Sequence, residues 1–126
     1  LEAIAEVDAK IIVFALNNSA VVEVGEKMGI SVAREVYSDR EHTADGSIIL
    51  TRKGSVIHNY QEMADRVVRM VKEGIVVTHT GEEAPIKADT VCIHSDTPGA
   101  AELAKAIVKS LRENGIQIVP IHEVLG

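Results

Sequence analysis

Two kinds of apolar pattern alternate along the chain. Short runs rich in β-branched residues are typical of buried strands, whereas apolar residues that recur at every third or fourth position indicate one face of a helix. The expected strands cover residues 10–15, 30–37, 91–93 and 116–119. The expected helices cover residues 20–28, 60–73 and 98–114. This alternation predicts βα units and a mostly parallel sheet.

The residues at the helix ends support these boundaries. Gly29 and Gly74 follow the first two helices, where a glycine in the left-handed conformation commonly ends a helix. Asn59 is placed to cap the second of them. Thr97 and Pro98 read as the cap and the first residue of the third. We expect this third helix to bury Ala104, Ile107, Val108 and Leu111.

Two further segments lie between the strands and helices. Residues 75–78 and the neighbourhood of Ile86 predict a small hairpin that turns at Thr80-Gly81. Residues 38–54 are polar and irregular, with a turn signal at Asp45-Gly46. A connection of this length is unusual in a compact domain and is often functional.

The first residues read as the middle of a helix rather than the beginning of a domain. Residues 1–7 lack an initiator Met and place Leu1, Ile4 and Ala5 on one face. We therefore expect residues 1–126 to form a single α/β segment of a longer protein. The sheet could be open or could be an arc of a (β/α) barrel, and the interrupted first helix favours the arc.

Composition narrows the functional classes. The chain is 46% hydrophobic but only 2% aromatic, with a net charge of −6 and no basic stripe. Such a chain is poorly suited to binding nucleic acid. Within these residues we find no signal peptide and no apolar run long enough for a membrane. Its single cysteine, Cys92, lies in an apolar strand, which is compatible with a reducing cytoplasm.

Ionisable residues follow two of the predicted strands. His94 and Asp96 come directly after residues 91–93, and Glu35, Asp39 and Arg40 lie at or just beyond the end of residues 30–37. The carboxyl ends of parallel strands share one rim, which is where α/β proteins place their chemistry. The sequence therefore predicts an acid/base site at this rim.

Each of these residues also has an ordinary structural interpretation. Asp39 and Arg40 could form a surface ion pair worth about 0–1 kcal/mol, with Glu35 simply solvated. Asp96 could cap the helix that follows it. The polar residues after the first strand, Asn17-Asn18-Ser19, could cap a helix or bind a ligand. Among the other histidines, His58 precedes a helix and is a weaker site candidate. The remaining ones, His42, His79 and His122, are most simply exposed.

The chain lacks the familiar short catalytic motifs. It has no phosphate-binding glycine loop, dinucleotide fingerprint, Cys/His metal spacing or Gly-x-Ser-x-Gly elbow. The residues alone therefore indicate part of an α/β enzyme or a binding domain.

A family resemblance extends this interpretation. It is carried by Glu35-Val36-Tyr37-Ser38-Asp39-Arg40, Gly54-Ser55-Val56-Ile57-His58, residues 88–98 with Cys92-Ile93-His94-Ser95-Asp96, and Ile118-Val119-Pro120, in this order. In these segments the chain resembles the C-terminal half of the LamB/YcsF family of lactam-utilisation proteins. The resemblance implies half of a (β/α) barrel of the glycoside hydrolase/deacetylase-like type.

The resemblance also implies an activity and its residues. It points to a component of an ATP-dependent 5-oxoprolinase, which opens 5-oxo-L-proline to L-glutamate with subunits B and C as partners and with ATP bound largely outside this chain. We expect Asp39, Glu35 and His94 to orient or deprotonate water, with Asp96 positioning His94 or capping the helix. Arg40 would hold the substrate carboxylate or a phosphate, and His58 would also bind substrate. The chain alone is expected to be inactive.

Two other functions stay open at this point. The first is a metal-dependent deacetylase-like hydrolase of a carbohydrate or amide, with His94 and Asp96 as ligands beside others from the missing half. The second is a non-catalytic module for small-molecule binding or assembly. An isolated segment with an open sheet edge would also tend to self-associate as a homo-oligomer.

Overall fold

The computed structural model describes residues 1–49 and 59–126, which form an α/β fold around a parallel sheet. The sheet has the strand order β1-β2-β5, with β1 at Val13–Leu16, β2 at Val32–Tyr37 and β5 at Thr90–Cys92. Both strand pairs are parallel. The first strand was expected from residue 10, but its ladder begins only at Val13, which pairs with Val32.

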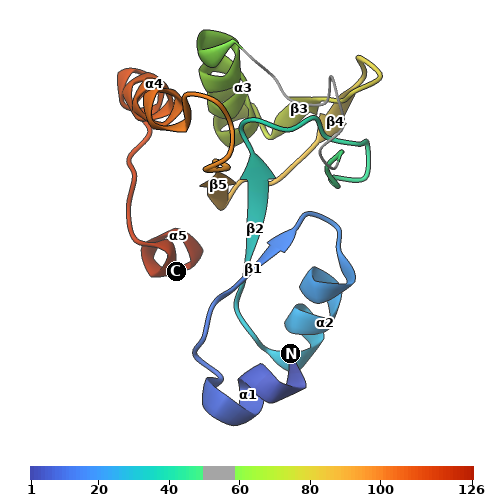
Figure 1. The fold of residues 1–126 in the computed structure, drawn as a ribbon. Coiled ribbons are helices and arrows are strands. Elements are labelled where there is room, and N and C mark those ends of the chain that lie inside the picture. The colour runs from blue at the N-terminus through green and yellow to red at the C-terminus, as the bar shows by residue number, and fades with distance from the viewer. Residues whose placement is uncertain (50–58) are drawn as a thin grey trace.

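Helices and a hairpin connect these strands (Figure 1). Helix α2 (Ala20–Met28) joins β1 to β2, and α3 (Tyr60–Glu73) follows the loop after β2. Strands β3 (Ile75–Val77) and β4 (Glu83–Pro85) then form an antiparallel hairpin. Helix α4 (Ala100–Glu113) follows β5. The expected boundaries of the two helices α2 and α3, and the hairpin itself, are confirmed.

The helix ends follow the expected chemistry in two places and depart from it in a third. Gly29 and Gly74 adopt left-handed conformations, and the Asn59 side chain accepts hydrogen bonds from two backbone N–H groups at the start of α3. At α4, however, the cap is Gly99, with φ of 74°, rather than Thr97. The Thr97 hydroxyl is buried and bonded elsewhere, so it is not available to cap the helix.

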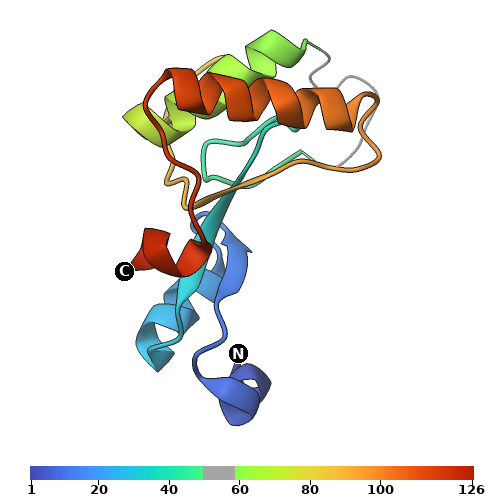
Figure 2. The same ribbon diagram turned by 90° about the vertical axis from the view of Figure 1, so that its left-hand side faces the viewer.

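The hydrophobic core lies among β2, α3, the hairpin and α4. Met63, Val67 and Met70 of α3 and Leu103 of α4 are fully buried in it. Helices α3 and α4 lie side by side, as Figure 2 also shows. On α4 the buried apolar residues are Leu103, Ile107 and Leu111. The expected burial of Ala104 and Val108 is only partial, because both line an open groove beside β5.

The last part of the chain differs most from expectation. Residues 116–119 were expected to form a strand, but they have no ladder partner in the described part of the chain and run as an extended connection. A short helix, α5 (Ile121–Leu125), follows them. Strand β5 was expected to be buried on both faces, yet all three of its residues are half-exposed. With no fourth strand beside it among the described residues, β5 is the edge of the sheet.

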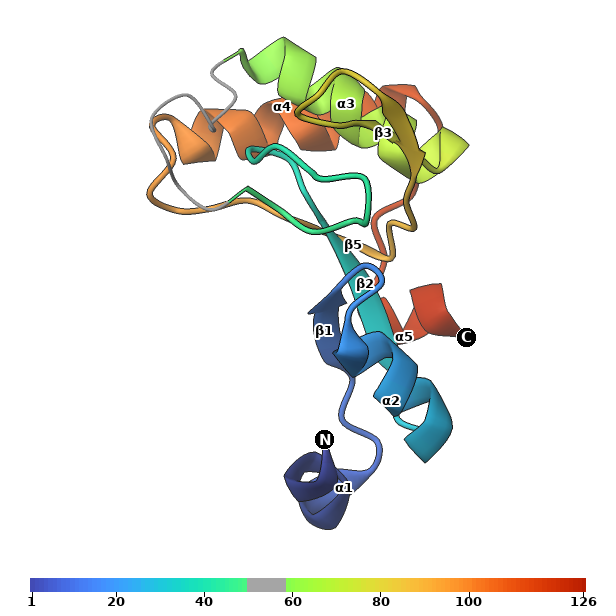
Figure 3. The same ribbon diagram turned by 90° about the vertical axis from the view of Figure 1, so that its right-hand side faces the viewer.

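The two ends of the molecule are packed very differently. Helix α1 (Glu2–Asp8) buries none of its residues and lies at the opposite end from α3 and α4 (Figure 3). Phe14 of β1 is 49% exposed. No helix in residues 1–49 and 59–126 is long and apolar enough to cross a membrane.

Candidate functional site

The segment that follows β2 is irregular in structure but buried. Strand β1 ends where Leu16 pairs with Glu35, so the residues after Tyr37 have lost their neighbour on that side. Tyr37, Ser38, Asp39 and Arg40 are nonetheless all buried. Buried backbone needs hydrogen-bond partners, and both the amide and the hydroxyl of Ser38 donate to the Cys92 carbonyl of β5. This pairing brings the end of β2 against the end of β5.

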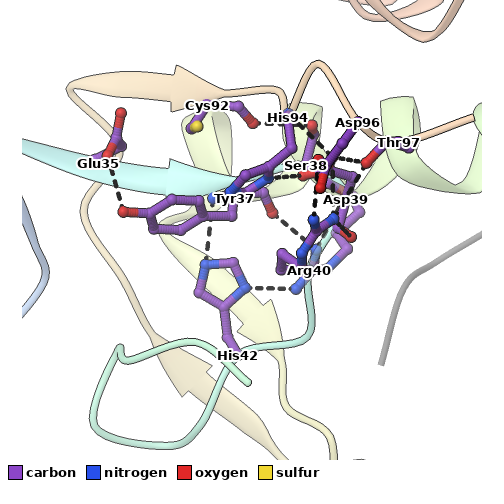
Figure 4. A network of polar contacts seen from close by, with 11 residues as sticks. Glu35, Tyr37, Ser38, Asp39, Arg40, His42, Cys92, His94, Asp96 and Thr97 are labelled. Atoms are coloured by element: carbon purple, nitrogen blue, oxygen red, sulfur yellow. Dashed lines mark hydrogen bonds and ion pairs between the residues drawn. The ribbon is translucent and has the colours of Figure 1, made fainter. Parts of the chain in front are cut away.

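Asp39 is the centre of a buried polar cluster (Figure 4). One carboxylate oxygen lies 2.8 Å from Nδ1 of His94, and the other accepts from the Thr97 hydroxyl at 2.5 Å and from the His94 amide at 3.1 Å. Burial alone would raise the Asp39 pKa, but the hydrogen bonds from Thr97 and His94 outweigh burial and hold the pKa below its usual range. Asp39 is therefore a carboxylate at neutral pH.

This carboxylate fixes the state of His94. Because ionised Asp39 can only accept hydrogen bonds, Nδ1 of His94 carries the proton that faces it. In this tautomer the lone pair of the ring lies on Nε2, on the other side. The imidazole stacks on the Tyr37 ring, with the centroids 5.7 Å apart, and 29% of the His94 side chain is exposed. His94 is thus an oriented base with access to solvent.

Arg40 is tied into the same cluster. Its guanidinium lies 3.3 Å from the Asp39 carboxylate and 3.5 Å from Asp96, and it donates to the Thr97 hydroxyl. The interpretation of Asp39 and Arg40 as a surface ion pair is wrong, because both side chains are almost completely buried.

Glu35 and Asp96 lie at the margins of this cluster. Glu35 is inside β2, and its carboxylate accepts a 2.8 Å hydrogen bond from the Tyr37 hydroxyl. Burial, followed by the nearby Glu35, raises the Tyr37 pKa. Asp96 is 77% exposed on its side chain and contacts Arg40. It does not cap α4, which begins at Gly99, and the carboxylate that holds His94 is Asp39. His58 lies outside the described residues.

Two residues that contact the cluster, His42 and Arg66, were not identified from the sequence. His42 was expected to be exposed in the loop, but it is completely buried. Its Nε2 faces the Tyr37 amide at 3.3 Å, and its Nδ1 faces Arg66 of α3 at 2.6 Å. Burial and the positive charge of Arg66 lower the His42 pKa to about 4, so the ring is neutral at pH 7. His79 and His122 are exposed, as expected.

The polar residues after β1 serve the structure. The Asn17 side chain donates to the Glu35 and Lys87 carbonyls and accepts from the Lys87 amide. It therefore links the end of β1 to β2 and to the segment that leads into β5. Ser19 precedes α2, but its hydroxyl is buried without a hydrogen-bond partner among the described residues.

A separate apolar groove lies beside β5. It has a volume of about 560 Å³ and lies among β5, α4 and the segment that ends in α5. Its lining includes Phe14, Val91, Ile93, Val108, Ile118 and Val124. The polar cluster and this groove are therefore distinct, and the groove is lined mostly by apolar residues. Among residues 1–49 and 59–126, no three His, Cys, Asp or Glu side chains are grouped so that they could hold a metal ion.

The fold and the site together define a class. The chain is an α/β protein that holds an Asp–His pair where two parallel strands end, an arrangement suited to proton transfer. Comparison with known sequences makes the assignment specific. A model of the LamB/YcsF family matches residues 1–126, and the chain belongs to this family.

Its relatives share one description, the A subunit of 5-oxoprolinase. The chain is 44% identical over 126 residues to this protein from Thermococcus sibiricus, and the match covers 99% of the chain and 49% of the relative. It is 45% identical over 119 residues to the protein of the same name from Nitrobacter hamburgensis, covering 94% and 47%. The chain thus spans about half the length of the curated relatives it matches.

A solved structure supports the fold. The crystal structure of a lactam utilization protein from Thermus thermophilus superposes on the chain with a TM-score of 0.82 at 32% identity. The match covers 93% of this chain and 47% of that one. The expected family and the α/β fold with a parallel sheet are confirmed.

Proposed function

We propose that this chain provides the Asp39–His94 pair of a 5-oxoprolinase, which opens 5-oxo-L-proline to L-glutamate at the expense of ATP. The proposal is supported by two independent facts. The relatives of the chain are named as one component, the A subunit, of that enzyme. In the pair, a buried carboxylate holds Nδ1 of His94, and the histidine side chain is 29% exposed, which suits it to act as a base.

The reaction is the hydrolysis of a cyclic amide. The amide bond is stabilised by resonance, reflected in a rotation barrier of about 18–20 kcal/mol, so its carbonyl carbon is a poor electrophile. His94 Nε2 accepts a proton from water while the water oxygen bonds to the ring carbonyl carbon. The carbon–nitrogen bond then breaks, and the departing nitrogen takes up a proton. The product is an open chain with a new carboxylate and a free amino group.

ATP would supply activation of the amide oxygen when it is bound. We assign its binding to residues outside this chain, with subunits B and C as partners. The state of Arg40 supports the assignment of ATP to other residues. Asp39 and Asp96 already neutralise the charge of Arg40, and its side chain is almost completely buried, so it is poorly placed to bind a phosphate. In this proposal Arg40 binds the substrate carboxylate only if Asp96 moves aside. Glu35 contributes through Tyr37 and not through the water.

The groove beside β5 supports a proposal about the rest of the protein. We propose that the chain is the C-terminal half of a (β/α) barrel, and that strands of the other half pair with β5 and cover Phe14 and Ile118. The exposed β5 edge and the unpaired segment 116–119 favour this arrangement. So does the match to about half of each relative.

The test is a steady-state measurement on the assembled complex that contains the full-length protein. ATP-dependent release of glutamate is followed for His94→Ala and Asp39→Asn. His79→Ala serves as the matched control, because His79 is an exposed histidine in the β3–β4 turn. General-base catalysis contributes about 10²–10⁴-fold, and we expect kcat to fall within this range for His94→Ala. The control should keep normal turnover.

Asp39→Asn tests the tautomer directly. An asparagine at this position can donate to Nδ1 of His94, which favours the ring with its proton on Nε2 and removes the free lone pair. We expect a loss comparable to that of His94→Ala. Normal turnover in either variant would remove that residue from the mechanism.

A further inference from the structure

One buried connection behind the site is not used by the mechanism. It runs from α3 to the end of β2, and Arg66 makes it. Nη1 of Arg66 donates to the Tyr37 carbonyl at 2.9 Å and to the Ser38 carbonyl at 3.3 Å, while Nη2 lies 2.6 Å from His42 Nδ1. These two carbonyls belong to the residues immediately before Asp39.

Arg66 provides hydrogen bonds to backbone carbonyls at the end of β2. Beyond Glu35 no described strand lies on the β1 side of β2, so the peptide groups of Tyr37 and Ser38 have no ladder partner there. The side chains fill that place, since His42 faces the Tyr37 amide and Arg66 binds the two carbonyls. Without these partners, buried carbonyls would be left unpaired at the point where the chain turns into the site.

The choice of arginine at this position follows from the number of acceptors that its side chain reaches. Arg66 is half-buried, and burial lowers its pKa to about 10. Among the described residues, no carboxylate lies within ion-pair distance of its guanidinium. A half-buried cation without such a partner is costly, and the hydrogen bonds to the Tyr37 and Ser38 carbonyls, which an apolar side chain would leave unpaired, offset this cost. What arginine adds is a rigid fork that reaches two carbonyls and a ring nitrogen together.

We propose that Arg66 is a positioning residue for the Asp39–His94 pair. It fixes the Tyr37 and Ser38 peptides, and these set the direction in which Asp39 leaves the strand. They also place the Tyr37 ring, on which His94 stacks. The proposal deepens the proposed function and rests on it for its kinetic consequences, but its structural part can be tested without any activity.

The first measurement is the tautomer of His94. In the full-length protein labelled with ¹⁵N, we expect the His94 ring to carry its proton on Nδ1, and His94→Ala assigns the signal. In Arg66→Met both tautomers of the His94 ring, with the proton on Nδ1 or on Nε2, should be populated. The reason is that the Asp39 carboxylate would no longer be fixed in the orientation that faces Nδ1. Arg66→Lys keeps the charge but not the fork, and we expect an intermediate result. An unchanged His94 signal in both variants would overturn the proposal.

The second measurement separates positioning from binding in the assembled complex. A displacement of about 1 Å at a site can cost about 10²-fold in rate. We expect kcat to fall about 10–100-fold in Arg66→Met, with KM nearly unchanged, and Arg66→Lys to recover part of the loss. Arg69→Met is the matched control, because Arg69 lies on the same helix but pairs with Glu73 and Glu83 at the surface. Equal losses in Arg66→Met and Arg69→Met would reduce Arg66 to a structural role and overturn the proposal.

The two proposals can fail separately. Normal turnover in His94→Ala would reject the proposed function, and the tautomer measurement would still decide whether Arg66 orients His94. Conversely, a large loss in His94→Ala together with normal kcat in Arg66→Met would keep the function and reject the positioning role. A melting temperature for each variant shows that the protein is folded under the assay conditions.

Discussion

The two ends of this molecule contain similar sequence patterns but differ greatly in how much they bury. In the core region (β2, α3, the hairpin and α4), Met63, Val67 and Leu103 have no exposed surface. In the N-terminal region (α1, β1 and α2), α1 buries nothing and Phe14 is half-exposed. The candidate site lies beside the core region, in the segment after β2 and in the segment between β5 and α4. Its carboxylate can keep one orientation because the backbone around it is held from both α3 and β5.

This difference shows that an apolar sequence pattern predicts a face that must be buried. The pattern does not predict which part of the protein buries that face. The core region finds its cover within the chain. Among residues 1–49 and 59–126, nothing covers the N-terminal region or the groove beside β5, and the relatives are about twice as long as the chain. A side chain with half its surface in water contributes correspondingly less to the free energy of unfolding. Three substitution experiments test this contrast.

The largest effect is expected in the core. Leu103→Ala should lower the free energy of unfolding by about 2–5 kcal/mol, because Leu103 is fully buried between α3 and α4 and the gap cannot close completely. Phe14→Ala removes more atoms, but Phe14 is half-exposed in this chain, and we expect a loss of only about 1 kcal/mol. Urea denaturation of both variants measures the difference.

The same pair of variants in a full-length protein tests the barrel proposal. If the other half covers Phe14, its truncation there should cost about 3–5 kcal/mol, as for a buried aromatic residue. A loss in the full-length protein no larger than in this chain would count against that cover. Leu103→Ala should cost the same in both settings.

The second effect is a loss of stability in mild acid. His42 has a pKa near 6.5 when unfolded and about 4 when folded, so the unfolded state binds the additional proton. Stability from this group is therefore full above pH 6.5 and is lost as the pH falls towards 4, by about 3 kcal/mol in all. Unfolding free energies measured across this range should fall for the parent chain. His42→Asn should be less stable at pH 7 but flatter in this window, and His79→Ala should keep the slope.

Asp39 acts in the same direction at lower pH. Its folded pKa is depressed, so its contribution is present above the ordinary carboxyl pKa and is lost as the pH falls through the lowered value. A pH slope in the His42→Asn variant that begins only below about pH 4 fits Asp39. An unchanged slope between pH 6.5 and 4 in that variant would show that other groups cause the loss.

The smallest effect contrasts two helix starts. Asn59→Ala should cost about 1 kcal/mol, because its side chain accepts hydrogen bonds from two backbone amides of α3. Ser19→Ala at the start of α2 should change stability by less than about 0.5 kcal/mol, since the serine hydroxyl is buried and bonds to none of the described residues. A cost for Ser19→Ala as large as that for Asn59→Ala would contradict this contrast.

Helices α2 and α3 and the hairpin were predictable because their signals are local, whereas α5 was not expected and α4 is capped by Gly99 rather than Thr97. The periodicity of α3, its Asn59 cap and its final Gly74 all lie within one stretch of sequence. The strands were less predictable, because a ladder needs a neighbour. Residues 116–119 have the composition of a strand, yet no described strand of this chain lies beside them to accept their hydrogen bonds.

The candidate site was predictable only where its residues directly follow a strand. Asp39, Arg40 and His94 were found because they follow strands, and parallel strands end at one rim. Thr97 and His42 were misread, because an irregular loop has no period from which burial can be inferred. Arg66 lies three positions from Met63 and from Arg69 on α3, and nothing in its spacing distinguishes it from an exposed arginine. Only the packing of α3 against the end of β2 reveals its contacts.

The cap of α4 has a consequence for how this family can vary. Tyr60 donates a 2.7 Å hydrogen bond to the Pro98 carbonyl, and any side chain at Gly99 would overlap the Tyr60 hydroxyl. The five residues from His94 to Pro98 are thus anchored at one end to Asp39 and at the other to α3. An inserted or deleted residue between these anchors would have to displace the imidazole or the helix. We therefore expect this loop to keep a constant length among active homologues, even where its other side chains are replaced.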